Sequence, residues 1–274
     1  MEKTNNIDVT VIIPVHELHD TNDQVLFGKA LESVRTQTTQ PKEILVVCPD
    51  SDILVNEINK VAEAAGIKIT LLRHNKDTDF CSQINHAVST IATEYFSILE
   101  LDDEYSNSYF KNVALYFEAY KADAYLPATV IVDKDNNALH YINEAVWASG
   151  FSEKLGFLDS ESLLQYNNFI ISGGVFKTEA YNEVGGLRGD IKLYFNYEFL
   201  LRFTHNDFSI MTIPKLGYKH MFERENSLFV QYKDPTNGIK AEEARFYLDS
   251  ARKEYFFNPN VIGRNLTYSL AVEE

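Results

Sequence analysis

Short apolar runs alternate with longer amphipathic segments along the N-terminal part of the chain. The apolar runs have the length and the valine and isoleucine content of buried strands, and they cover residues 9–15, 43–47, 67–72 and 95–101. The amphipathic segments repeat apolar side chains at helical spacing, and they cover residues 25–37, 53–65 and 80–91. Strands that alternate with helices of this length predict an α/β fold, with a Rossmann-like, mostly parallel central sheet flanked by helices.

The rest of the chain continues this pattern with more interruptions. Helices are expected at 109–121, 179–184 and 193–203, and strands at 124–132 and 209–213. Residues 140–165 are irregular, aromatic and acidic, which predicts an insertion that faces the substrate, and residues 221–231 are expected to form a loop that leads into a strand. A long amphipathic segment at 239–256 predicts a C-terminal helical extension.

The apolar run at 95–101 ends abruptly in carboxylates, at Glu100, Asp102, Asp103 and Glu104. Side chains alternate along a strand, so Glu100 and Asp102 are expected on the same side, about 7 Å apart, with Asp103 at the following turn. Two carboxylates at that separation can share one hard divalent cation. The alternative interpretation is an acidic strand end that faces water.

Composition narrows the function classes. The formal charge of -15 argues against a dedicated binder of nucleic acid or anionic lipid, because both require a basic surface. Two cysteines that lie far apart in sequence, Cys48 and Cys81, suit a reducing compartment and provide no metal-binding spacing. The polar start is unlike a signal peptide, and no apolar run approaches the roughly 18 residues of a membrane span. We therefore expect a cytoplasmic protein without an integral membrane segment.

Polar side chains follow three of the predicted strands. His16 and Glu17 follow the first strand, Asp50 and Asp52 follow the second, and the acidic run that begins at Glu100 follows the fourth. In open parallel sheets, ligands bind beyond the carboxyl ends of the strands. These three strand ends are therefore expected to meet at one crevice that binds a metal ion and a phosphate group.

Seven segments, in this order, resemble the family 2 glycosyltransferases, which have the GT-A fold and use nucleotide sugars. The segments are VIIPVHE, EILVV, the stretch around Asn85, ILELDD, SGGVF with VGGL, YEFLLR and HMFERENSL. The resemblance covers most of the chain, from about Val9 to about Leu228, and it rests on order and spacing together. It implies a nucleotide-sugar donor such as a UDP-sugar, a Mn²⁺ or Mg²⁺ ion at a D-x-D motif, and inversion at the anomeric carbon.

The resemblance also implies roles for individual residues. Asp102 matches the aspartate that usually touches the metal, Glu100 replaces the first aspartate of the motif, and His220 matches a histidine that completes the metal shell. Cys48 and Pro49 replace the aspartate pair that usually follows the second strand, and Asp50 is the expected substitute. The residues implied to bind the donor are Pro14, Val15, His16, Glu17, Asp50, Arg73, Asn85, Glu100, Leu101, Asp102, Gly173, Gly174 and Arg224.

An inverting transferase needs a carboxylate that accepts the proton of the acceptor hydroxyl. In the family this is an aspartate about six residues before a helix arginine. If Arg202 is that arginine, the position holds Asn196, which cannot act as a base. Glu198 and Asp190 are the nearest carboxylates and are therefore the candidate bases. The alternative for Glu198 is an ordinary helix ion pair with Arg202, four residues on.

Taken together, the resemblance implies a metal-dependent, inverting glycosyltransferase that acts on a glycan, a lipid-linked or a small-molecule acceptor, and that could form a homo-oligomer. The expected organisation is a GT-A domain over residues 1–235, with a nucleotide-binding half (1–104) and an acceptor half (105–235), and an extension over 236–274. The alternative is a catalytically silent GT-A domain that serves as a binding or assembly module. A sugar-nucleotide pyrophosphorylase would require a glycine-rich, basic loop after the first strand, and none follows Val15.

Overall fold

Four parallel strands form one half of the central sheet, in the spatial order β3-β2-β1-β4. They are β1 (Asn6–Pro14), β2 (Gln40–Pro49), β3 (Thr70–His74) and β4 (Tyr95–Ile98). The connecting helices are α1 (Thr21–Arg35), α2 (Asp52–Ala64) and α3 (Phe80–Val88). Each helix begins after a side chain that accepts a hydrogen bond from the backbone of its first turn, namely Asp20, Ser51 and Asp79.

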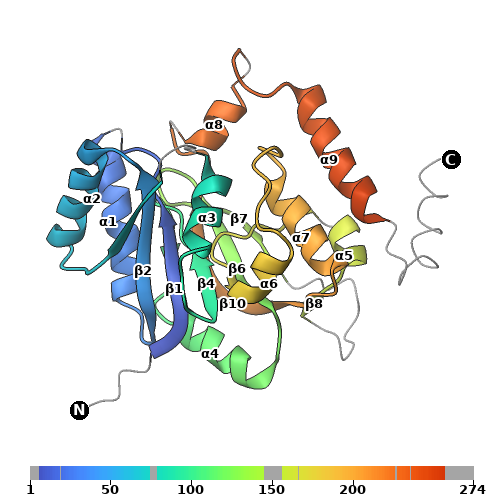
Figure 1. The fold of residues 1–274 in the computed structure, drawn as a ribbon, viewed down its shortest axis with the longest axis horizontal. Helices are drawn as coiled ribbons and strands as arrows, with labels where there is room; N and C mark the ends of the chain where they lie inside the picture. The colour runs from blue at the N-terminus through green and yellow to red at the C-terminus, as the bar shows by residue number, and fades with distance from the viewer. Residues whose placement is uncertain are drawn as a thin grey trace.

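These features come from a computed structural model, which describes residues 6–18, 20–74, 79–144, 156–165, 167–225, 227–234 and 236–256. Figure 1 shows α1 and α2 on one side of the sheet and α3, α6 and α7 on the other. Two apolar clusters fill the two faces between these layers. Among the residues described, no helix combines the length and hydrophobicity needed to cross a membrane.

The other half of the sheet mixes strand directions. Strand β9 (Val175–Lys177) runs antiparallel to β4 and to β6 (Ala124–Val132), and thereby joins the two halves. Strand β10 (Ile210–Met221) pairs parallel with β6 and antiparallel with the short β5 (Glu104–Tyr105). Two strands lie off this path: β7 (Ala138–Ile142), which pairs with β6, and β8 (Phe157–Leu158), which pairs with β10.

The remaining helices complete the layers. They are α4 (Tyr109–Ala119), α5 (Ser160–Gln165), α6 (Thr178–Glu183), α7 (Phe195–His205), α8 (Leu228–Tyr232) and α9 (Ala241–Phe256). Helix α9 packs against α5 and α7, and Ala251 on α9 is buried. The expected C-terminal helix is therefore present and rests on the second half of the fold.

Strand β10 is much longer than the expected strand at 209–213. Pro214 and Gly217 lie in its interior, and residues of these types usually interrupt strands. The strand continues through an irregular stretch, where Ile213 pairs with Pro127 but Tyr218 pairs with Thr129. Five steps along β10 (213 to 218) thus correspond to two along β6 (127 to 129), which leaves three extra residues on β10.

Two other expectations differ from the structure. The loop expected at 221–231 does not lead into a strand, because the Ser227 side chain accepts a hydrogen bond from Val230 N and begins α8. The irregular insertion expected at 140–165 contains the end of β7, β8 and α5, while its part at 145–155 lies outside the described residues. Residues 257–274 of the expected C-terminal extension also lie outside them.

Candidate functional site

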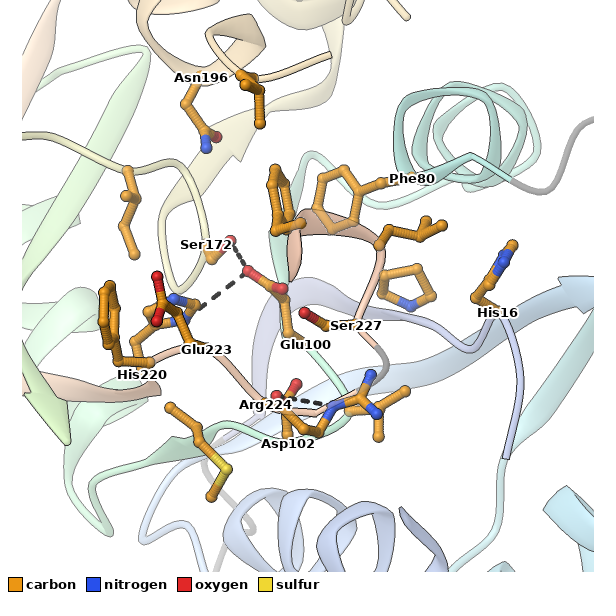
Figure 2. Close-up of a pocket in the computed structure, with 18 of the residues that line it drawn as sticks. His16, Phe80, Glu100, Asp102, Ser172, Asn196, His220, Glu223, Arg224 and Ser227 are labelled. Carbon is orange, nitrogen blue, oxygen red and sulfur yellow. Dashed lines mark hydrogen bonds and ion pairs between the residues drawn. The ribbon is translucent and has the colours of Figure 1, made fainter. Parts of the chain in front are cut away.

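A pocket of about 350 Å³ opens where β1, β4 and β10 end. It lies at the carboxyl edge of the parallel strands β1 and β4. Figure 2 shows its lining, to which the acidic turn after β4 and the segment after β10 both contribute. Side chains from the start of α3, from the residues around the start of α7 and from α8 complete the wall. The site therefore lies at the edge of the sheet where the sequence places a crevice.

The acidic residues after β4 form a turn rather than a continuation of the strand. Strand β4 ends at Ile98, and the N–H of Asp103 donates to the carbonyl oxygen of Glu100 at 3.1 Å. A turn closed in this way brings its first and fourth residues together. The expected continuation of the strand through Asp102 is therefore wrong, because these residues lie in a turn in which Asp103 returns to Glu100.

Glu100, Asp103 and His220 form a candidate cation site, because each offers one ligand atom and these atoms all lie within 4.8 Å of one another. His220 Nδ1 lies 2.8 Å from Asp103 Oδ2 and 3.9 Å from Glu100 Oε1. The Ser172 hydroxyl donates to Glu100 Oε1 at 2.6 Å, and Met221 N donates to Asp103 Oδ1 at 2.8 Å. Carboxylate oxygens and an imidazole are suitable ligands for Mn²⁺ or Mg²⁺.

Asp102 has a different partner. Arg224 Nε donates to Asp102 Oδ2 at 3.0 Å, and the same guanidinium donates to Asp23 Oδ1 on α1 at 2.9 Å (Figure 2 shows the first contact). All three side chains are at most 12% exposed. The arginine thus ties the acidic turn to α1 and to the segment after β10, and it places a fixed positive charge beside the candidate cation site.

The electrostatics of this cluster favour an additional positive charge. Burial, with the neighbouring charge of Asp103, raises the pKa of Glu100 to about 7 and that of Asp102 to about 6. Burial acts to lower the pKa of His220, but the charge and hydrogen bond of Asp103 outweigh it and raise the pKa to about 10. A divalent cation would relieve the repulsion among these carboxylates, so the residues fit such an ion.

These shifts predict a pH dependence of stability. Because the folded pKa values of Glu100 and Asp102 lie above those of exposed carboxylates, about 4, the folded state binds more protons between about pH 4 and pH 7. Stability from these groups therefore decreases as pH rises through this window. Urea unfolding at pH 5 and pH 7.5 in chelator should show a smaller decrease for Glu100→Gln than for the wild type. Identical decreases would contradict the assignment.

Several residues implied to bind the donor do line this pocket, namely Pro14, His16, Glu17, Glu100, Leu101, Asp102 and Arg224. Val15 is completely buried, and its N–H donates to Val47 O. Asp50 and Arg73 lie at the ends of β2 and β3 and do not line the pocket. They form an exposed ion pair at 2.8 Å, to which Asp52 also contributes. The end of the second strand therefore does not reach the crevice.

Asn85, Gly173 and Gly174 hold the backbone in place beside the pocket. The Asn85 side chain donates to Leu187 O at 2.8 Å and accepts from Leu187 N at 2.8 Å, so it fixes the loop between α6 and α7. Gly173 has φ +76°, and a Cβ atom there would lie 2.4 Å from the ring of Tyr218. A Cβ atom at Gly174 would also collide, at 2.8 Å from Ile171 O. The glycines are thus required by the close packing of this turn.

The two candidate bases lie outside the pocket lining. Glu198 on α7 is completely buried and accepts two hydrogen bonds from Arg202, at 2.7 and 3.0 Å. Asp190 is exposed and pairs with Arg188 at 2.8 Å. Asn196 does line the pocket, and its Oδ1 atom is buried without a hydrogen-bond partner among the described residues.

Two residues of the candidate site, one in the cation site and one in the pocket lining, escaped the sequence-based prediction. Asp103 was present in the acidic run, but only the turn geometry shows that it faces Glu100 and His220. Gln83 on α3 lines the pocket and is 1% exposed. Its position three residues after Phe80, which also lines the pocket, was the available signal, since residues at this spacing share a helix face.

The fold and the pocket together define an α/β protein of the GT-A type, with an acidic ligand site at the carboxyl edge of its sheet. The family model described as Glycosyl transferase family 2 matches residues 10–179, which is more than half of the chain. The chain therefore belongs to this family, and the resemblance drawn from its motifs is confirmed.

Solved structures of TarS from S. aureus have the same fold. TarS 1–349 in complex with UDP-GlcNAc matches with a TM-score of 0.63 and 15% identity over 92% of this chain and 67% of that chain. The complex with UDP matches with a TM-score of 0.58 and 15% identity, over 79% of this chain and 61% of that one. The match covers only 37% of the longer TarS structure. A comparison with curated proteins found no match.

Proposed function

We propose that this chain transfers a sugar from a nucleotide-sugar donor, with a UDP-sugar as first choice, to an acceptor hydroxyl. The observation that carries the proposal is the convergence of Glu100, Asp102, His220 and Arg224 on one pocket, in a chain of glycosyltransferase family 2. TarS, which has the same fold, has been solved with UDP and with UDP-GlcNAc. The acceptor class stays open among glycans, lipid-linked sugars and small molecules.

We further propose that the transfer depends on a divalent cation and inverts the anomeric carbon. Glu100, Asp103 and His220 would hold Mn²⁺ or Mg²⁺, with Asp102 beside them. When bound, the cation supplies charge neutralisation for the departing diphosphate. Arg224 is a second, built-in positive charge at the same place, held by Asp102 and Asp23.

In the proposed reaction, the acceptor oxygen forms a bond to the anomeric carbon as the bond from that carbon to the diphosphate oxygen breaks. The nucleoside diphosphate leaves with the electron pair, and the acceptor proton passes to a general base. Among the described residues, the carboxylates that line the pocket are Glu17, Glu100, Asp102 and Glu223. Glu100 and Asp102 belong to the acidic turn. Glu17 lies after β1, among the residues that the family resemblance implies bind the donor. We therefore assign the base to Glu223.

The backbone of Glu223 has a positive φ angle. Its φ is 52°, in the left-handed region that residues other than glycine rarely adopt. Such backbone strain concentrates at functional sites. The Glu223 carboxylate is within 3.4 Å of Lys233 Nζ, and the side chain is 49% exposed, so an acceptor can reach it from solvent.

Isothermal titration with UDP, with and without Mn²⁺, tests the proposed function. We expect at least about tenfold tighter UDP binding in Mn²⁺, and we expect Glu100→Ala to lose this gain because it removes a ligand. Glu104→Ala is the matched control, since Glu104 pairs with Lys219 at 2.5 Å and does not line the pocket. No UDP binding under either condition would contradict the proposal. UDP binding without turnover of any UDP-sugar would favour the silent binding module.

A further inference from the structure

Asp23 on α1 is a buried carboxylate that holds Arg224 from outside the pocket. Its Oδ1 atom accepts a hydrogen bond from Arg224 Nη1 at 2.9 Å, from a residue 201 positions further along the chain. The Asp23 side chain is 6% exposed and does not line the pocket, whereas Arg224 does. Asp23 therefore reaches the pocket through the arginine.

The helix favours a negative charge at Asp23 as well. Asp23 lies in the first turn of α1, and its backbone N–H donates to Asp20 Oδ1 at 3.0 Å. The N–H groups at the start of a helix and the helix dipole stabilise a carboxylate there. The charge of Asp23 is therefore supported by α1, whatever the pocket contains.

Arg224 has a second carboxylate partner, and this one belongs to the pocket. Arg224 Nε donates to Asp102 Oδ2 at 3.0 Å, and Asp102 lines the pocket beside the candidate cation site (Figure 2). Asp102 would share its charge with a divalent cation in that site, so its attraction for the arginine would weaken. Asp23 belongs neither to the cation site nor to the pocket lining, so its contact with Arg224 does not depend on the cation.

The guanidinium of Arg224 keeps donors for a ligand. A guanidinium carries five N–H groups, and the two carboxylates accept one from Nε and one from Nη1. In the ranges that the structure describes, the hydrogen bonds of the Arg224 side chain go to these two carboxylates. The planar fork of an arginine matches the oxygens of a phosphate group, so the remaining N–H groups suit the diphosphate of a nucleotide.

We propose that Asp23 is a positioning residue for the diphosphate, which keeps Arg224 in the pocket while Asp102 faces the cation. The inference rests on the proposed function, and it adds a residue of α1 that touches neither the donor nor the cation. An anchored guanidinium loses less side-chain freedom when UDP binds, so more of the contact energy appears as affinity. The alternative is a purely structural tie between α1 and the segment after β10.

The test compares UDP with uridine, which lacks the diphosphate, by titration in Mn²⁺. We expect Asp23→Asn to weaken UDP binding at least about tenfold and to leave uridine binding within about twofold, because the amide no longer holds the guanidinium by charge. Asp23→Glu keeps the charge and should recover most of the UDP affinity. In an Arg224→Gln background, Asp23→Asn should cause no further loss, because the contact that it supports is already gone.

Asp123→Asn is the matched control for a structural carboxylate. Asp123 accepts hydrogen bonds from Ser209 N at 2.9 Å and from Ser209 Oγ at 2.8 Å, and it does not line the pocket. Its substitution should lower the melting temperature and leave both affinities unchanged. The inference is overturned if Asp23→Asn also changes only the melting temperature, or if it weakens UDP and uridine equally. Failure of the wild type to bind UDP would instead overturn the proposed function.

Discussion

Changing Glu223 to glutamine is expected to lower the turnover of a UDP-sugar by about 10²–10⁴-fold, the usual range for the loss of a general base. The amide keeps the size of the side chain but cannot accept the acceptor proton. UDP affinity should be unchanged, because Glu223 is not part of the candidate cation site of Glu100, Asp103 and His220. Turnover is measured as release of UDP, and affinity by titration with UDP and Mn²⁺.

Glu225→Gln is the matched control for this prediction. Glu225 belongs to the same segment, is exposed and does not line the pocket, so its loss should leave turnover within about twofold. If Glu223→Gln retains full turnover, the base lies elsewhere, and Glu198 and Asp190 return as candidates. If the variant loses UDP binding together with turnover, Glu223 acts in binding rather than in proton transfer.

Replacing Glu198 by alanine is expected to lower the free energy of unfolding by about 3–5 kcal/mol, because it leaves the buried guanidinium of Arg202 without its counterion. The Glu198 side chain is 0% exposed and that of Arg202 is 11% exposed. Arg202 also donates to the carbonyl oxygens of Val184 and Gly186, so it fixes the loop between α6 and α7. Urea unfolding of the purified variant measures the loss.

Asp190→Ala provides the comparison for Glu198→Ala. The Asp190 side chain is 65% exposed in its pair with Arg188, and such surface pairs contribute about 0–1 kcal/mol. A catalytic role for Glu198 would show the opposite pattern, with a stable Glu198→Gln variant that has lost turnover. An unchanged unfolding free energy for Glu198→Ala would contradict the structural role.

The order of strands and helices was predictable because hydrophobic periodicity reports burial. Strand β1 is buried from Val9 to Pro14, and the predicted run at 9–15 follows this burial closely. Periodicity fails where the backbone changes direction without a change in burial. The run at 95–101 continues through the apolar Leu99 and Leu101, yet the strand ends at Ile98. The same limit hid the length of β10, whose Pro214 and Gly217 indicate an interruption.

The position of the candidate site was predictable, but only some of the residues that form it were. The sequence located the acidic run and His220, because strand ends in a parallel sheet share one edge. The sequence could not show whether Asp102 or Asp103 joins Glu100 and His220 in the candidate cation site, since this depends on a turn that brings Asp103 to Glu100. Nor could it identify Gln83, because the pocket that this residue lines is formed by several elements of the fold.

The irregular stretch of β10 determines which side chains of the strand face the candidate site. Side chains alternate along a strand, so three extra residues, an odd number, exchange the two faces of everything that follows. In the phase that results, His220 meets Asp103, while Lys219 turns to Glu104. A strand one residue longer at this point would place Lys219 where His220 lies, and would present an ammonium group to the acidic turn. The number of extra residues in the bulge of β10, which precedes the site in the chain, therefore determines whether the site contains an imidazole or an ammonium group.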